Sequence, residues 1–79
     1  MSTREKLIEK WRNATDYEAF ETVKKLLEYY GYDIKGTGSS HNTFRKEGRL
    51  LITVPKENNR VKPIYLRQII RFLEERGDI

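Results

Sequence analysis

His41 is the only histidine in the chain, and it follows a segment rich in glycine and serine, residues 36–40. Histidine is the side-chain type that most readily accepts and donates protons near neutral pH, so His41 could perform acid–base chemistry. The alternative interpretation is an ordinary surface histidine after a polar loop. Which of the two holds depends on the charges that the fold places around it.

The charge of the chain is unevenly distributed. Sixteen lysines and arginines against twelve aspartates and glutamates give a formal net charge of +4. Residues 16–33 are acidic, whereas residues 35–67 are basic, with eight lysines and arginines against two glutamates. This distribution favours a surface that binds a polyanion, and the alternative is an ordinary solvated face.

Composition excludes several classes of protein. The chain has no cysteine, which removes disulfides, thiolate nucleophiles and cysteine-based metal sites. No apolar run approaches the roughly 20 residues that span a bilayer. The first residues lack the apolar core of a secretory signal, so a cytoplasmic protein is expected. The length of 79 residues predicts one small domain.

Three segments have the periodicity of amphipathic helices: residues 4–12, residues 17–30 and the segment that starts at Pro63. Pro63 suits a first helical position, and Gly31 and Gly77 suit the position after a helix end. Their apolar stripes are Leu7, Ile8 and Trp11, then Phe20, Val23, Leu27 and Tyr30, then Leu66, Ile69, Ile70 and Leu73.

Alternation of apolar and polar residues predicts a three-stranded antiparallel meander over residues 32–55. Leu50, Ile52 and Val54 alternate in its last strand. Residues 55–62 form a polar loop, too charged to bury. The order α-(α)-β-β-β-α predicts an α+β fold, a two-layer sandwich with the helices on one face of the sheet. The open face would then carry Lys35, His41, Thr43, Arg45 and Thr53.

Two segments of the chain resemble the HicA family of toxin–antitoxin ribonucleases, whose fold is like a double-stranded-RNA-binding domain. Residues 36–45 are similar to the family's Gly-Ser-His turn, in which the histidine is catalytic. Residues 61–70 resemble the family's Lys-Pro start of the last helix. One extra residue, Ser40, separates Gly38-Ser39 from His41. Residues 16–79 would form the HicA-like domain, and residues 1–15 a helical extension.

The resemblance implies cleavage of RNA phosphodiester bonds without a metal or other cofactor. The 2′-hydroxyl next to the scissile phosphate would attack phosphorus, and His41 would serve as the general acid and base. Cations would neutralise the phosphate, and backbone N–H groups of the turn could form an anion nest. The implied phosphate-binding residues are Lys35, Gly38, Ser39, Ser40, Arg45, Lys62 and Arg67.

The implied partners are mRNA and a HicB-type antitoxin protein that covers the His41 face. Two other functions fit the same sequence. A module of this fold could bind structured or double-stranded RNA without cutting it, with an affinity that falls steeply with salt. An interaction protein could use the open sheet face to hold a protein partner.

Overall fold

The computed structural model describes residues 2–35 and 41–79, so the predicted turn with Gly38, Ser39 and Ser40 lies outside the described residues. Three helices and five strands follow one another along the described chain. They are α1 (Thr3–Arg12), β1 (Glu18–Ala19), α2 (Phe20–Tyr29), β2 (Asp33–Lys35), β3 (His41–Arg45), β4 (Ile52–Pro55), β5 (Arg60–Val61) and α3 (Pro63–Glu75). Among them, no helix is long and apolar enough to cross a membrane.

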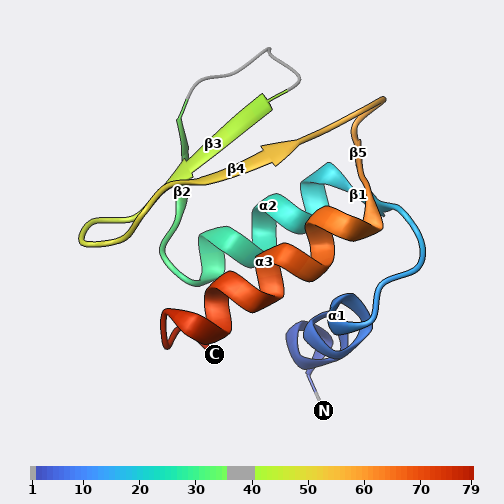
Figure 1. Ribbon diagram of the computed structural model, residues 1–79, viewed down its shortest axis with the longest axis horizontal. Helices are drawn as coiled ribbons and strands as arrows, with labels where there is room; N and C mark the ends of the chain where they lie inside the picture. Colours follow the sequence, from blue (N-terminus) through green and yellow to red (C-terminus); the bar gives the residue numbers. More distant parts are fainter. Residues whose placement is uncertain (1, 36–40) are drawn as a thin grey trace.

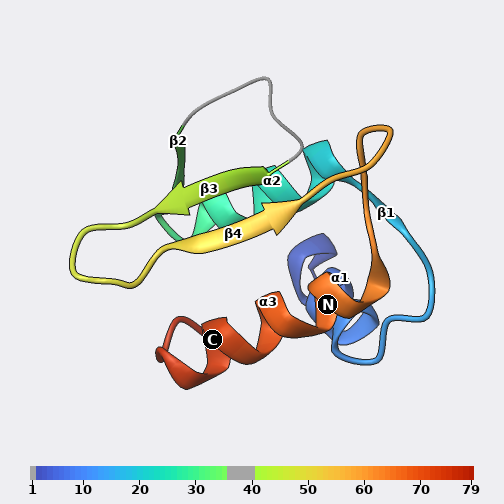
Figure 2. The same ribbon diagram turned by 45° about the horizontal axis from the view of Figure 1, so that its top comes forward.

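The predicted meander is confirmed. Strands β2, β3 and β4 form an antiparallel sheet in that order, and α2 and α3 cover one of its faces (Figure 1 and Figure 2). Phe44 pairs with Ile34 on one side and with Ile52 on the other. Because side chains alternate along a strand, this register turns Phe44, Ile52 and Val54 inward. The molecule is thus the predicted α+β sandwich.

The open face of the sheet carries the polar side chains that the alternation predicted. Lys35, His41, Arg45 and Thr53 are exposed there, and Thr43 is half-buried. The register places Lys35 opposite Thr43 and His41 opposite Pro55. His41 therefore stands at the first residue of β3, beside the end of β4.

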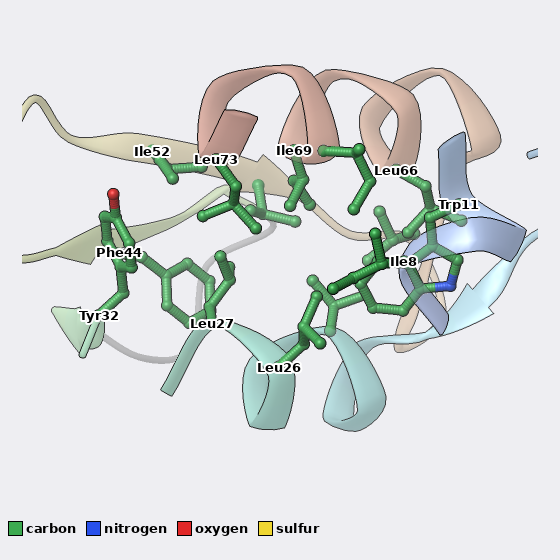
Figure 3. Close-up of a cluster of buried hydrophobic side chains, with 14 of the residues drawn as sticks. Ile8, Trp11, Leu26, Leu27, Tyr32, Phe44, Ile52, Leu66, Ile69 and Leu73 are labelled. Carbon is green, nitrogen blue, oxygen red and sulfur yellow. The ribbon is translucent and has the colours of Figure 1, made fainter. Parts of the chain in front are cut away.

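The hydrophobic core lies between the sheet and the helices (Figure 3). The periodic stripes of α2 and α3 supply most of it, and Ile8 and Trp11 of α1 complete it at one end. Trp11, which belongs to the predicted apolar stripe, is fully buried and anchors the first helix to the domain. Replacing a buried tryptophan with alanine typically costs about 3–5 kcal/mol of stability. The first helix is thus packed into the domain.

Helices α2 and α3 both end at a glycine with a positive φ, as predicted. The φ of Gly31 is 91° and that of Gly77 is 79°. After α3, Gly77 N donates to the carbonyl oxygen of Glu74, and Asp78 N donates to that of Leu73. This left-handed end satisfies the last carbonyl groups of the helix and reverses the chain. The reversal carries Asp78 back toward the sheet.

Three sequence predictions were wrong in detail. The second helix starts at Phe20 rather than at residue 17, because residues 18–19 pair with a strand. The segment 55–62 is not merely a polar loop, since it contains β5 and the fully buried Val61. Leu50 does not take part in the last strand of the meander. It is 78% exposed, and β4 begins at Ile52.

The unpredicted ribbon of β1 and β5 crosses one end of the helices. Glu18 pairs with Val61, and Ala19 pairs with Arg60. A tight turn precedes β5, with φ values of 53° at Asn58 and 61° at Asn59. Asparagine tolerates this left-handed conformation better than most residues do. Asn59 O also accepts a hydrogen bond of 2.8 Å from Phe20 N, which ties the turn to the start of α2.

Candidate functional site

A surface hollow of about 270 Å³ opens beside His41. It lies where β3 starts, where β4 ends and where α3 begins. The residues that line it are His41, Pro55, Lys56, Glu57, Arg60, Lys62 and Tyr65. We call it the His41 hollow. Since these residues come from β3, from the 55–62 segment and from α3, the hollow exists only when the whole domain is folded.

Positive charge predominates in the His41 hollow. Lys56, Arg60 and Lys62 are three cations, and Glu57 is one carboxylate among the described lining residues. Lys62 Nζ lies 3.7 Å from Glu57 Oε2, and both side chains are well exposed. An exposed ion pair of this kind contributes about 0–1 kcal/mol, so it holds the cation weakly. The hollow can therefore accept an anionic group of a ligand.

The turn before β5 positions the cations of the hollow. Glu57 N donates to Arg60 O at 2.8 Å, and Arg60 N donates to Glu57 O at 3.0 Å. The Lys56 ammonium lies 4.5 Å from the centre of the Phe20 ring. The Arg60 guanidinium lies 5.0 Å from the centre of the Tyr17 ring. Aromatic faces attract cations at these distances, so both side chains have defined positions.

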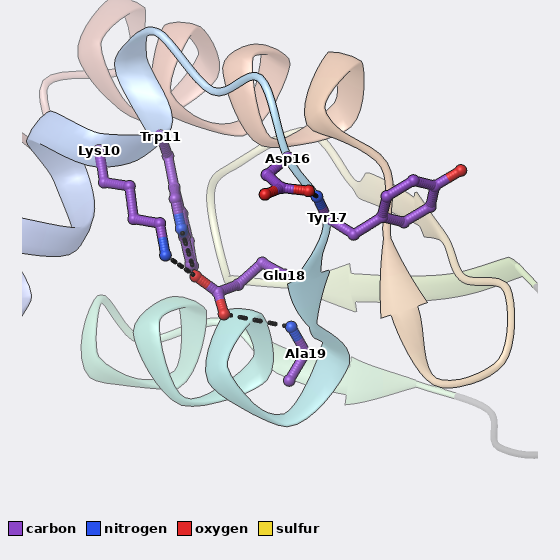
Figure 4. Close-up of polar contacts among 6 residues, drawn as sticks. All are labelled: Lys10, Trp11, Asp16, Tyr17, Glu18 and Ala19. Atoms are coloured by element: carbon purple, nitrogen blue, oxygen red, sulfur yellow. Dashed lines mark hydrogen bonds and ion pairs between the residues drawn. The ribbon is translucent and has the colours of Figure 1, made fainter.

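A polar network holds β1 against α1, and through β1 it holds β5 (Figure 4). Glu18 Oε2 accepts hydrogen bonds from Trp11 Nε1 at 3.1 Å and from Lys10 Nζ at 3.3 Å. Glu18 Oε1 accepts one from Ala19 N at 3.2 Å. Partial burial acts to raise the pKa of Glu18, but these three donors together outweigh it and hold the pKa below 4.5. Glu18 is thus an ionised bridge between α1 and β1.

The predicted site residues are only partly brought together. His41 and Lys62 share the hollow. Lys35 lies on the same open face of the sheet, at the end of β2, but it does not line the hollow. Arg67 donates a hydrogen bond to the carbonyl oxygen of Ala14, so it holds the connection after α1.

Arg45 is the last residue of β3 and does not line the His41 hollow. It lines a second surface hollow together with Gly31, Asp33, Lys46 and Glu47. Its register partner on β2 is Asp33, a residue of opposite charge. The candidate phosphate-binding set therefore divides between the two ends of this strand.

Lys46, the neighbour of Arg45 in the second hollow, contacts a buried carboxylate. Asp78 accepts a hydrogen bond of 2.8 Å from Lys46 Nζ and one of 2.7 Å from the buried Tyr32 hydroxyl. The side chain of Asp78 is 4% exposed. Burial acts to raise its pKa, but Lys46 and Tyr32 outweigh burial and hold the pKa below 3.8. We call Tyr32, Lys46 and Asp78 the Asp78 corner.

The sequence prediction missed two cations of the hollow, Lys56 and Arg60. Both lie in residues 55–62, the segment that the sequence predicted to be a polar loop. The pair Asn58-Asn59 is a signal that could have revealed it, because asparagines favour turns with positive φ at both central positions. Such a turn predicts that its two flanks, residues 57 and 60, face one another.

A family model described as the HicA toxin of bacterial toxin–antitoxin systems matches residues 20–74. The match begins at the first residue of α2 and ends within the last turn of α3. It includes His41 and every other residue of the hollow. Neither a curated protein nor a solved structure matches the chain.

Proposed function

The chain belongs to the HicA toxin family, and from this premise we propose that it is an endoribonuclease that cuts mRNA at the His41 hollow. As a member, it is the toxin of a toxin–antitoxin pair and has an antitoxin partner. The observation that carries the proposal is that His41 lines the same hollow as three cations, Lys56, Arg60 and Lys62. An imidazole can transfer the protons that cleavage of a phosphodiester bond involves, and neighbouring cations can stabilise the charge that develops on the phosphate.

The proposed reaction needs two proton transfers. His41 takes the proton of the ribose 2′-hydroxyl, and the 2′-oxygen forms a bond to phosphorus. The bond between phosphorus and the 5′-oxygen then breaks, and the imidazolium returns its proton to that oxygen. The products are a 2′,3′-cyclic phosphate and a free 5′-hydroxyl, so no water, oxidant or other reactant is consumed.

The cations would act on the charge of the phosphate. Negative charge builds up on the non-bridging oxygens as the 2′-oxygen attacks, and fixed cations stabilise this state. Arg60 suits the role because its guanidinium can bind two phosphate oxygens at once. Lys56 and Lys62 would add compact charges on either side. We further propose that the reaction proceeds without a metal ion.

We also propose that the antitoxin is of the HicB type and covers the His41 face. The exposed cations of the hollow favour an acidic covering surface. Such a surface would compete directly with RNA, because both would need Lys56, Arg60 and Lys62. The toxin would then not cleave RNA as long as the antitoxin is bound.

The test uses a long mixed-sequence RNA in the presence of EDTA. The parent protein should produce fragments with 2′,3′-cyclic phosphate ends. His41→Ala should slow cleavage by about 10²- to 10⁴-fold, the usual contribution of general acid–base catalysis. Arg49→Ala, which removes an exposed cation from the β3–β4 loop, is the matched control and should cleave at the parental rate.

Circular dichroism and a melting curve establish that both variants are folded. Equal cleavage by His41→Ala and the parent would overturn the proposed role of this residue. Binding of RNA by the parent without any cleavage would replace the proposal with an RNA-binding module. A requirement for added metal, with no cleavage in EDTA, would refute the metal-free mechanism.

A further inference from the structure

Tyr17 lies beside the His41 hollow but outside the region that the family model matches. Resting on the proposed function, we propose that Tyr17 and Arg60 form a stacking platform for an unpaired RNA base. The ligand of this face would then be single-stranded RNA. The platform would hold a base of the nucleotide whose phosphate, or neighbouring phosphate, occupies the hollow.

Arg60 is the residue that joins the platform to the hollow. Its guanidinium lies over the Tyr17 ring, 5.0 Å from the ring centre, and Arg60 is also one of the residues that line the hollow. A phosphate bound by Arg60 would therefore hold its nucleotide next to Tyr17. Tyr17 is 42% exposed, so part of its ring is open to a ligand.

The local backbone fixes the position of Tyr17. Tyr17 N donates a hydrogen bond of 3.1 Å to Asp16 Oδ1, and the next residue, Glu18, begins β1. The Glu18 side chain points toward Lys10 and Trp11, whereas the Tyr17 ring points away from them (Figure 4). The pairing of β1 with β5 then keeps Tyr17 close to Arg60. The platform is thus formed before any ligand binds.

The chemistry of the platform selects unpaired bases. Aromatic rings and arginine guanidinium groups stack bases that are splayed out of a strand. A base inside a duplex is already stacked and paired, so its face is not available. A cationic groove that follows the backbone, with aromatic side chains along it, is the usual arrangement in proteins that bind single strands. The Tyr17–Arg60 pair and the hollow reproduce this arrangement on a small scale.

A second exposed tyrosine provides a matched comparison. Tyr29 also lies under an arginine, with the Arg4 guanidinium 4.1 Å from its ring centre. It lines a groove between α1 and α2 whose other side chains include Leu7 and Leu26. None of the cations of the His41 hollow lines that groove. Arg4 and Lys25 also line that groove, but His41 does not. Tyr29 therefore has the same local chemistry as Tyr17 outside the hollow in which we propose that the phosphate binds.

The experiment measures binding in the His41→Ala background, so that the RNA stays intact. The probes are a fluorescent single-stranded RNA of mixed sequence and the same RNA annealed to its complement, followed by anisotropy. Tyr17→Ala should weaken binding of the single strand on the order of tenfold, the scale of one lost base stack. Tyr17→Phe should keep the parental affinity and Tyr17→Leu should not, since only the former keeps an aromatic face. Tyr29→Ala should change nothing.

Two outcomes would overturn the inference. One is a loss for Tyr17→Ala no larger than that for Tyr29→Ala. The other is a duplex that binds as tightly as the single strand and responds equally to Tyr17→Ala. If the parent protein cleaves RNA but Tyr17→Ala does not weaken binding, the platform is refuted and the proposed function stands. If the parent neither binds nor cuts RNA, the proposed function itself fails.

Discussion

At the start of β3, His41 faces Lys56, Arg60 and Lys62, with Glu57 as the one carboxylate among the described residues that line the hollow. At the end of the same strand, the polar groups are matched: Lys46 and Tyr32 both donate to the buried Asp78. Both ends carry cations, but the hollow at the end of β3 has as many carboxylates as cations among its described lining residues. They differ in that Lys46 has a buried acidic partner, whereas the carboxylate that faces Lys62 is exposed.

This difference separates stability from ligand binding. A cation that contacts a buried carboxylate stabilises the fold, and its removal leaves an uncompensated charge. Cations that face an exposed carboxylate or an aromatic ring contribute little to the fold and stay available for an anionic ligand. The net charge of a surface therefore does not identify a binding site. What identifies it is whether each cation contacts a buried carboxylate or an exposed group.

The largest effect on stability that this comparison predicts is at the Asp78 corner. Asp78→Ala removes the ion pair with Lys46 and the acceptor of the Tyr32 hydroxyl, so the free energy of unfolding should fall by about 2–3 kcal/mol. Urea denaturation measures this loss. Glu47→Ala removes an exposed carboxylate from the same end of β3 and should stay within about 0.5 kcal/mol of the parent. Similar losses for both variants would remove the distinction between the two ends.

Acid should destabilise the protein through the same buried carboxylate and through Glu18. The pKa values of Asp78 and Glu18 are lowered, so their stabilisation is complete above their ordinary values of 3.8 and 4.5. It disappears as the pH falls through the lower values of the folded state. Melting temperatures measured from pH 6 to about pH 2 should therefore decline below about pH 4. The decline should be shallower in Asp78→Asn, and an equal decline would contradict the role of this carboxylate.

Removing a cation from the hollow should reduce RNA binding by about tenfold and leave stability almost unchanged. Arg60→Ala should also lower the slope of log affinity against log salt by about 0.7, the value for one phosphate contact on a single strand. A salt titration of single-stranded RNA binding gives this slope. Lys46→Gln should keep the parental slope, because Lys46 pairs with Asp78. An unchanged slope in Arg60→Ala would show that phosphate binds elsewhere.

The smallest expected effect is an increase in RNA affinity. Glu57→Gln removes the carboxylate that faces Lys62 at 3.7 Å, so RNA affinity should rise about two- to threefold, the scale of an exposed ion pair. The same anisotropy titration measures it, at low salt, where screening is weakest. Weaker binding of RNA by Glu57→Gln would mean that the carboxylate helps to position Lys62.

The long periodic segments could be predicted from sequence because their side chains repeat the geometry of the element. The stripe Leu66, Ile69, Ile70 and Leu73 defined α3, and alternation defined the meander with His41 on its open face. The ribbon of β1 and β5 could not be predicted, since two residues are too short to show a period. The hollow depends on that ribbon, so Arg60 was missed while His41 and Lys62 were found.

The contacts of α1 with α3 have a consequence for how the chain folds. Arg12 bonds to Glu74, 62 residues away, and Arg67 bonds to Ala14, 53 residues away. Such contacts require closure of a long loop, which slows folding relative to the formation of local helices. A nascent chain on the ribosome has no α3 against which Trp11 can be buried. We therefore expect α1, the first helix to be synthesised, to reach its packed position only after α3 has been made. The hollow is complete only after the whole domain has been synthesised.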